Sequence, residues 1–368
     1  MGNPDKDPRI IKEIKTLGAA GYDIYSLCWH ASNDMSDNLA DVNYTKINLP
    51  LPKVNGTLCI ILWPVWWLYV LFSLIRVDCD IIHALNYNSI FPSLVAGKLK
   101  RIPVIYEIMD ISYDAIEMPS ALKRTIVYLD KLFMRFSDSV IIVDENQLKQ
   151  LGGIPNSHIS VIYDSALDVF DSNLPHSRKQ HINEFTILYV GVLYKIRHLN
   201  IDTLCHAIKN IQGVQLIIAG YGDLVEDINM WASQSNGSIN FIGRISYSEA
   251  LRRSMGADAL VVLRDSNIRT NRYICGSKIW EAMMCGKPIL VNKGTSTANK
   301  VLETNCGLVV DANNVEEIKD AIITLRDNPE LCNELGANGR RAYETQYSWE
   351  IMGKNLVDCY KELICEKM

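Results

Sequence analysis

Residues 264–294, RDSNIRTNRYICGSKIWEAMMCGKPILVNKG, predict a loop, a helix, a turn and a buried strand in that order. A Gly-Ser turn at 276–277 precedes the helical run 278–284. Gly286 closes this helix, and the apolar strand 289–291 follows. A Gly/Ser turn that leads into a helix offers free backbone N–H groups and the positive end of a helix dipole. The stretch therefore predicts a phosphate-binding site at the start of the helix.

A lysine and a glutamate of this helix, Lys278 and Glu281, lie three residues apart and so share one face. A carboxylate at this position can accept hydrogen bonds from both hydroxyls of a ribose while the preceding turn holds a diphosphate. An ordinary helix start with a solvated Lys–Glu pair fits the same spacing. The residues alone leave both interpretations open.

The segment 278–288, KIWEAMMCGKP, closely resembles the donor-site signature of glycosyltransferase family 4, the retaining GT-B enzymes also described as glycosyl transferases group 1. That signature pairs two glutamates separated by seven residues. Glu281 matches the second, which binds the nucleotide ribose in the family. Tyr273 occupies the place of the first, and it offers a hydroxyl but not the charge of a carboxylate. The resemblance implies an α/β chain with two Rossmann-like domains that face an interdomain cleft.

Composition limits the class of protein further. A length of 368 residues suggests two domains, each large enough for its own core. A net charge of −5 argues against nucleic acid as the main partner. The ten cysteines form no CxxC pair and have no histidine at metal-ligand spacing, which is typical of buried thiols in a reducing cytosol. No signal peptide precedes Asp5, so we expect a cytoplasmic protein.

The two predicted domains differ in role. Residues 1–171 form the N-terminal acceptor-side domain, and the polar segment 172–184 is the linker. Residues 185–348 form the C-terminal domain that binds the nucleotide-sugar. The resemblance implies that the last helix, 349–368, crosses back onto the N-terminal domain.

The start of the chain lacks an expected strand. A helical pattern at 10–17 leads to a strand at 24–28, whereas a parallel α/β domain normally opens with a strand and a glycine-containing loop. The sequence leaves three explanations open: a start codon placed late, a shortened chain, or a sheet with one strand fewer. We prefer the first.

Residues 58–75, LCIILWPVWWLYVLFSLI, are uncharged throughout. As a helix they would extend about 27 Å, just short of a hydrocarbon core of roughly 30 Å, and Pro64 would kink or start the helix. We expect a core helix whose outer face contacts the membrane surface; a plain core helix and a membrane span are the alternatives. Four aromatic residues suit an interfacial depth: Trp63, Trp66, Trp67 and Tyr69. The basic residues of the helix predicted at 121–136 are expected to be solvated.

The carboxyl ends of two predicted strands, 80–86 and 103–110, carry the candidate catalytic residues of the first domain, because ligands collect at such ends. In many family members a histidine ends the second of these strands, and here the matching position is Met109. The catalytic candidates are His83, Glu107, Asp110 and, in the second domain, Tyr273. A lone His83 is more often a packed strand residue than a catalyst.

The second domain supplies the predicted donor site. Gly191 matches the family's glycine after the first strand, and Arg197 falls where a lysine that grips the diphosphate is usual; Val192 replaces a common arginine. The turn at 243–244 edges the nucleotide base in the family. The predicted donor-binding residues are Gly191, Lys195, Arg197, Gly220, Gly243, Arg244, Gly276, Ser277, Lys278 and Glu281.

The resemblance implies a hexosyltransferase that moves a sugar from a UDP- or GDP-linked donor to an acceptor hydroxyl with retention of configuration. We expect no metal and no cofactor, and a glycan or lipid-linked acceptor, with the enzyme peripheral on the cytoplasmic membrane face. A non-catalytic binding subunit is one alternative, because Tyr273 and Met109 depart from the family pattern. A nucleotide-sugar epimerase is another. An NAD dehydrogenase is disfavoured because Val225 occupies the place of the third fingerprint glycine after Gly220.

Overall fold

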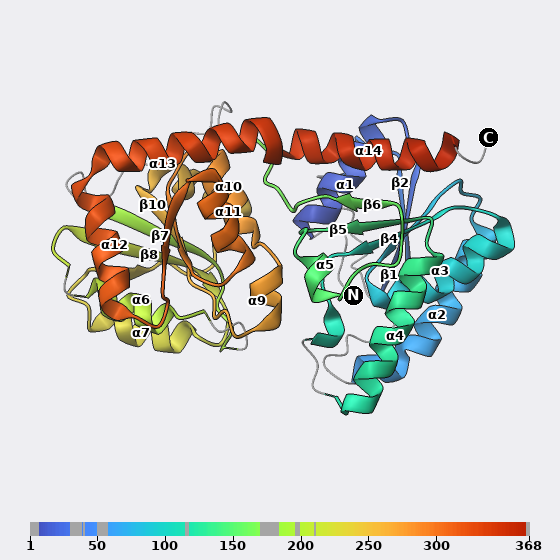
Figure 1. Ribbon diagram of the computed structural model, residues 1–368, viewed down its shortest axis with the longest axis horizontal. Helices are drawn as coiled ribbons and strands as arrows, with labels where there is room; N and C mark the ends of the chain where they lie inside the picture. The colour runs from blue at the N-terminus through green and yellow to red at the C-terminus, as the bar shows by residue number, and fades with distance from the viewer. Residues whose placement is uncertain are drawn as a thin grey trace. The chain divides into compact units, whose positions relative to one another are not determined.

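The structure, a computed structural model, describes residues 7–29, 39, 41–49, 58–114, 118–169, 184–195, 199–209 and 211–365. The chain divides into two compact α/β units (Figure 1). Unit 1 combines Met1–Tyr163 with Glu350–Met368, and unit 2 is Asp164–Trp349. Most of the predicted linker 172–184 lies outside the described residues, and so does the predicted diphosphate ligand Arg197.

Unit 2 is built around one six-stranded sheet in the order β12-β11-β10-β7-β8-β9. All neighbouring strands pair in parallel. The strands are β7 (Phe185–Val192), β8 (Val214–Tyr221), β9 (Ile239–Phe241), β10 (Ala259–Val262), β11 (Ile289–Asn292) and β12 (Gly307–Val310). The chain passes from β7 outward to β9 and then returns to β10 on the other side of β7. The strand order therefore reverses between β7 and β10, and in open α/β sheets ligands bind outside the carboxyl ends of the strands at such a switch point.

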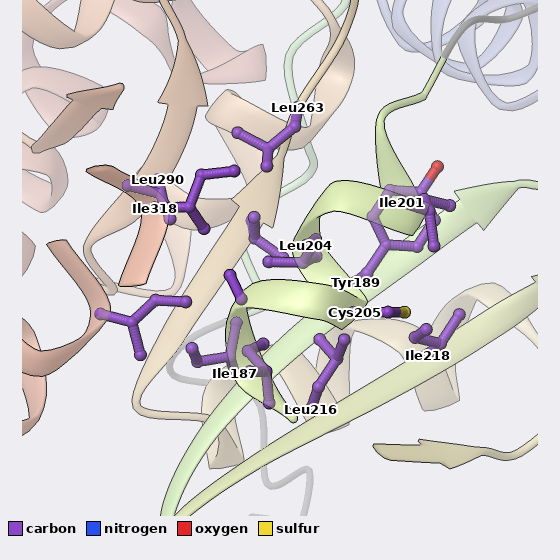
Figure 2. Packing of buried hydrophobic residues seen from close by; sticks show 14 of the residues in the cluster. Ile187, Tyr189, Ile201, Leu204, Cys205, Leu216, Ile218, Leu263, Leu290 and Ile318 are labelled. Carbon is purple, nitrogen blue, oxygen red and sulfur yellow. The ribbon is translucent and has the colours of Figure 1, made fainter. Parts of the chain in front are cut away.

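The core of unit 2 lies on a sheet whose strands are apolar on both faces, as parallel strands covered by helices are. Figure 2 shows Ile187 of β7 and Leu216 of β8 packed close to Leu204 of a neighbouring helix. The helices of the unit are α6 (Ile201–Ile208), α7 (Val225–Ser233), α8 (Tyr247–Gly256), α9 (Arg269–Tyr273), α10 (Ser277–Met284), α11 (Ser296–Thr304), α12 (Val315–Asp327) and α13 (Pro329–Ala342), followed by a π-helical turn, η5 (Tyr343–Tyr347).

The stretch 264–294 folds as predicted from its main helix onward, but the part predicted as a loop contains the short helix α9 (Arg269–Tyr273). Helix α10 and strand β11 form at the expected places, and Gly286 ends the helix in the left-handed conformation with φ 62°. A residue with a Cβ rarely adopts that conformation, which explains the glycine. The helix is held in the core because Ile279, Trp280 and Met283 are fully buried.

Unit 1 contains a four-stranded parallel sheet in the order β3-β4-β5-β6 and a separate parallel pair, β1 and β2. The strands are β1 (Ile24–Trp29), β2 (Tyr44–Leu49), β3 (Ile82–Leu85), β4 (Val104–Ile108), β5 (Ser139–Ile142) and β6 (Ile159–Val161). The first described element is helix α1 (Pro8–Ala19), capped by the side chain of Asp7. The strand that the sequence lacks would precede this helix, and residues 1–6 lie outside the described residues.

Helices cover the sheets of unit 1, and one of them comes from the end of the chain. They are α1, α2 (Leu58–Arg76), α3 (Tyr87–Lys100), α4 (Ser120–Phe136), α5 (Gln147–Gln150) and α14 (Trp349–Cys365), with a 3₁₀ turn, η3 (Ser112–Asp114). In α14, Met352 Sδ accepts a hydrogen bond from Tyr163 N at 3.3 Å, and Cys359 Sγ lies 3.4 Å from Ser139 Oγ. The C-terminal helix thus packs on the sheet of unit 1.

Helix α2 confirms the helix predicted at 58–75 but corrects the role given to one tryptophan. Trp66 is 4% exposed, and its ring centroid lies 5.7 Å from that of Trp29, so it belongs to the core rather than to an interface. Pro64 lies inside the helix. The exposed large apolar side chains of α2 are Val65, Leu68, Phe72 and Ile75, whose spacing puts them along one face. Within the described ranges, no helix is long and apolar enough to cross a membrane.

Candidate donor site and charged clusters

One buried amide ties together the ends of three strands at the switch-point edge of unit 2. Asn292, the last residue of β11, donates from Nδ2 to the backbone oxygen of Arg264 at 2.6 Å. Its Oδ1 accepts from the backbone N–H of Ala312 at 2.8 Å. Arg264 follows β10 and Ala312 follows β12, so this amide fixes the positions at which the chain leaves the sheet.

Helix α10 begins close to Arg264 with an N-cap that has no side chain. The N-cap is Gly276, whose own N–H donates to Thr297 Oγ1 at 3.3 Å. A Cβ on Gly276 would lie 3.3 Å from Cζ of Arg264, so a glycine lets the guanidinium lie against the helix start. A cation beside the positive end of a helix dipole favours binding of an anion at the same place. The arrangement suits a diphosphate, and sequence reasoning had not singled out Arg264.

The predicted pair on α10 forms in the structure. Lys278 Nζ lies 2.8 Å from each carboxylate oxygen of Glu281. Glu281 is 4% exposed, whereas Lys278 is half-buried. Each carboxylate oxygen has two lone pairs, so Glu281 can still accept hydrogen bonds from two ribose hydroxyls while it holds Lys278. Ser277 opens the same helix, next to Gly276.

Two glycines bring the ends of β7 and β8 close together. Gly191 pairs in register with Gly220, and a Cβ on Gly220 would lie 2.0 Å from the backbone oxygen of Gly191. After β7, the exposed Lys195 Nζ forms an ion pair with Asp227 Oδ2 at 2.9 Å. The hydrogen bond to Asp227 raises the pKa of Lys195. The predicted diphosphate ligand Lys195 therefore has an acidic partner in this structure.

An arginine and two tyrosines lie together beyond β7, β8 and β9. Arg244, which follows Gly243, has its Cζ 4.6 Å from the ring centroid of Tyr221. The rings of Tyr221 and Tyr194 lie 6.2 Å apart at 87°. All three side chains are exposed, and aromatic faces with an adjacent guanidinium can stack on a planar base. Sequence reasoning named Gly243 and Arg244 but not the tyrosines.

Two predicted catalytic residues, His83 and Glu107, belong to a buried charged cluster of unit 1. Glu107 Oε1 accepts from Arg9 Nε at 2.8 Å, and Glu107 Oε2 lies 3.0 Å from His83 Nε2. His83 Nδ1 lies 2.8 Å from the hydroxyl of Tyr360. Burial alone would raise the pKa of Glu107, but the Arg9 guanidinium and His83 outweigh burial and lower that pKa to about 2. Glu107 is fully buried and the cluster joins α1, β3, β4 and α14, so a structural role is evident. A catalytic role for His83 or Glu107 stays a prediction.

The other two catalytic candidates are more accessible. Asp110 is exposed just after β4, and Tyr273 is half-buried at the last residue of α9. A catalytic role for either stays a prediction. Among the residues that the structure describes, no group of three His, Cys, Asp or Glu side chains could hold a metal ion. That the protein works without metal or cofactor also stays a prediction.

The fold and the switch-point edge define a class of protein: an α/β chain with the GT-B fold whose second unit is suited to a nucleotide diphosphate. Residues 174–342 match the family model described as "Glycosyl transferases group 1". The matched residues are less than half of the chain, and this part of the chain is similar to that family.

Characterised and uncharacterised relatives align with parts of the chain. One is the GDP-mannose-dependent monoacylated alpha-(1-6)-phosphatidylinositol monomannoside mannosyltransferase of Corynebacterium glutamicum, 30% identical over 146 residues, which are 39% of this chain and 38% of the relative. Another is the uncharacterized glycosyltransferase MJ1178 of Methanocaldococcus jannaschii, 30% identical over 179 residues, which are 48% of each chain. The chain thus spans less than half the length of these relatives.

Solved structures share the fold over nearly the whole chain. Sucrose-phosphate synthase from Thermosynechococcus elongatus has a TM-score of 0.74 at 17% identity and covers 96% of this chain and 92% of its own. Anabaena HepE in complex with UDP has a TM-score of 0.73 at 16% identity and covers 98% of both chains. At these identities the likeness concerns the fold alone, and it agrees with the predicted GT-B architecture.

Proposed function

We propose that the protein is a retaining hexosyltransferase that moves a sugar from a UDP- or GDP-linked donor, bound by unit 2, to an acceptor hydroxyl. The observation that carries the proposal is the start of α10, where an uncapped helix end, Arg264 and the Lys278–Glu281 pair meet beside the sheet's switch point. The match of residues 174–342 to the group 1 family model supports it. A relative named for GDP-mannose and a structural neighbour bound to UDP support the two donor classes.

In the proposed reaction, unit 2 stabilises the departing diphosphate. The bond between the anomeric carbon and a diphosphate oxygen breaks, and the acceptor oxygen bonds to the same face of that carbon. The hydroxyl proton passes to the departing diphosphate. Backbone N–H groups of α10 and the Arg264 guanidinium counter the charge that develops on the diphosphate, as preorganised donors do in other enzymes. Glu281 fixes the ribose and so aligns the anomeric carbon.

A screen of donor binding tests this proposal. Purified protein would be heated with UDP-, GDP- and ADP-sugars, and the midpoint of unfolding compared with that of the free protein. A ligand at a hundred times its dissociation constant stabilises the folded state by about 2.7 kcal/mol. We expect one donor class to raise the midpoint and to be slowly hydrolysed by the protein. Binding without hydrolysis or transfer would favour the non-catalytic subunit that Tyr273 suggests, and no binding at all would contradict the proposal.

We further propose that the acceptor is lipid-linked and that unit 1 contacts the cytoplasmic face of the membrane. The exposed apolar face of α2 supports this, because Leu68 is 69% exposed and Phe72 is 54% exposed. Arg76 lies over the ring of Phe72 at 3.7 Å, which puts a cation at the edge of the apolar face. Exposed apolar side chains flanked by cations suit an interface with anionic lipid. A relative named for a phosphatidylinositol mannoside gives the same acceptor class.

Cosedimentation with vesicles tests the membrane contact. Wild-type protein should pellet with phosphatidylcholine–phosphatidylglycerol vesicles, and the double variant Leu68→Ser/Phe72→Ser should stay in the supernatant with an unchanged unfolding midpoint. Leu302→Ser is the matched control, because Leu302 is also 69% exposed but lies in unit 2. The proposed surface would be contradicted if wild-type protein fails to pellet with the vesicles. It would also be contradicted if Leu302→Ser loses vesicle binding as completely as the double variant.

A further inference from the structure

The residue at the carboxyl end of β3 has an unusual backbone conformation. Asn86 has φ 60° and ψ 171°, a region that glycine occupies freely and other residues rarely. A glycine would make this turn without strain. The asparagine side chain must therefore supply interactions that offset the conformation.

The side chain of Asn86 reaches across to the end of the neighbouring strand β4. Its Oδ1 accepts hydrogen bonds from Met109 N at 2.9 Å and from Asp110 N at 3.1 Å. The backbone N–H of Asn86 donates to Glu107 O at 2.8 Å. Asn86 is also the N-cap of α3, where an asparagine normally accepts from the first turn of its own helix, but it makes no such bond here. The side-chain amide of Asn86 therefore holds the end of β4 and does not cap α3.

The residue held in this way presents an exposed acid. Asp110 is exposed, and within the described ranges its carboxylate forms no ion pair or hydrogen bond. It lies at the carboxyl ends of β3 and β4, the edge at which open parallel sheets bind ligands. Its neighbour Glu107, by contrast, is buried against Arg9.

We propose that Asn86 is a positioning residue that holds Asp110 so that its carboxylate accepts a hydrogen bond from the acceptor hydroxyl. The inference rests on the proposed glycosyltransferase function and adds an acceptor-side contact to it. Two hydrogen bonds to one amide oxygen fix the peptide groups on both sides of the Met109 Cα, so the backbone sets the direction in which the Asp110 side chain leaves the sheet. A carboxylate fixed in this way can hold the acceptor hydroxyl in one orientation, and orientation of a reacting group contributes to catalysis.

Three variants separate positioning from mere folding. Asn86→Gly removes the amide and relieves the backbone, Asn86→Asp keeps an acceptor oxygen at the same place, and Asp110→Asn keeps the backbone but removes the charge. Transfer would be measured from GDP-mannose and from UDP-glucose to octyl α-mannoside, with the dissociation constant of each donor measured on the same samples. Amide hydrogen exchange at Met109 and Asp110 reports directly whether their N–H groups are hydrogen-bonded to Asn86.

We expect Asn86→Gly and Asp110→Asn to lower kcat for transfer by on the order of 10²-fold, the size that misplacement of a reacting group produces. Donor affinity should change less than twofold. Asn86→Asp should restore transfer and exchange protection, and the Asn86→Gly/Asp110→Asn double variant should be no slower than Asp110→Asn. Normal transfer by Asn86→Gly, or an equal loss of donor affinity, would overturn the proposal. Wild-type protein that binds neither donor would overturn the proposed function as well.

Discussion

Replacing Glu281 by glutamine is the sharpest test of the donor site. The structure gives Glu281 two carboxylate oxygens, each 2.8 Å from Lys278 Nζ, in a side chain that is almost fully buried. Hydrogen bonds to a charged group contribute about 1.5–3 kcal/mol, and those between neutral groups about 0.5–1.5 kcal/mol. Glutamine also turns one acceptor into a donor, so the ribose should lose about 1–3 kcal/mol of binding free energy, and the dissociation constant of UDP or GDP should rise about 5- to 150-fold.

The fold should tolerate this substitution. Lys278 is half-buried and can turn toward water, and glutamine still offers it one oxygen, so we expect the free energy of unfolding to fall by about 1 kcal/mol or less. Titration calorimetry with UDP, GDP and pyrophosphate makes the decisive comparison, because pyrophosphate has no ribose and should bind both proteins equally. Glu316→Gln is the control, since Glu316 also pairs with a lysine three residues away, Lys319, on the exposed side of α12. Unchanged nucleotide affinity, or an equal loss for pyrophosphate, would refute the assignment.

Three further predictions concern the two cores and the sugar. Burial raises the pKa of Asp130 to about 6, although the hydroxyls of Tyr106 and Tyr113 donate hydrogen bonds to it. The folded state therefore holds this proton more tightly than the unfolded state. The stabilisation that results is full below the usual pKa of an aspartate and is lost as pH rises through 6. Wild-type protein should thus lose about 2 kcal/mol relative to Asp130→Asn between pH 4 and pH 7.5 in urea titrations, and a constant difference would count against this. Tyr273→Phe should change turnover or sugar preference but leave the affinity for UDP and GDP intact in calorimetry. A parallel loss of nucleotide affinity would show that Tyr273 does not act on the sugar alone. Gly220→Ala should cost about 1–3 kcal/mol or more in denaturant unfolding, because its Cβ would collide with the backbone of Gly191, and a neutral effect would show that the strands can separate there.

Local patterns in the sequence were enough to predict the elements around α10. Within the stretch 264–294, Gly276, Gly286 and Pro288 lie at the ends of α10 and before β11, and each favours such an end through its own backbone preference. The contact of Arg264 with Gly276 could not be predicted this way, because it depends on where the chain leaves the sheet after β10. The one signal for this contact was the position of Arg264, which follows a buried strand and begins the stretch 264–294.

The first unit was harder to predict for two physical reasons. Helix α2 is apolar on every side, so its periodicity does not separate the buried Trp66 from the exposed Leu68. The charge that neutralises Glu107 comes from Arg9, 98 residues earlier, and no local pattern indicates such a partner. The sequence therefore carried no sign that Glu107 is half of a buried ion pair.

The packing of α14 on unit 1 has a consequence for the order in which the protein is made. Unit 1 needs residues from both ends of the chain, whereas unit 2 is one uninterrupted segment. On the ribosome the hydroxyl of Tyr360, which meets His83 in the finished fold, emerges after the whole of unit 2. Unit 1 is thus completed only after unit 2 has been made, and until then the face of its sheet that receives Cys359 and Tyr360 stays uncovered by this helix. Nascent chains in which residue 349 has emerged but α14 has not would carry a complete second unit and an incomplete first one, a species that chaperones would be expected to bind.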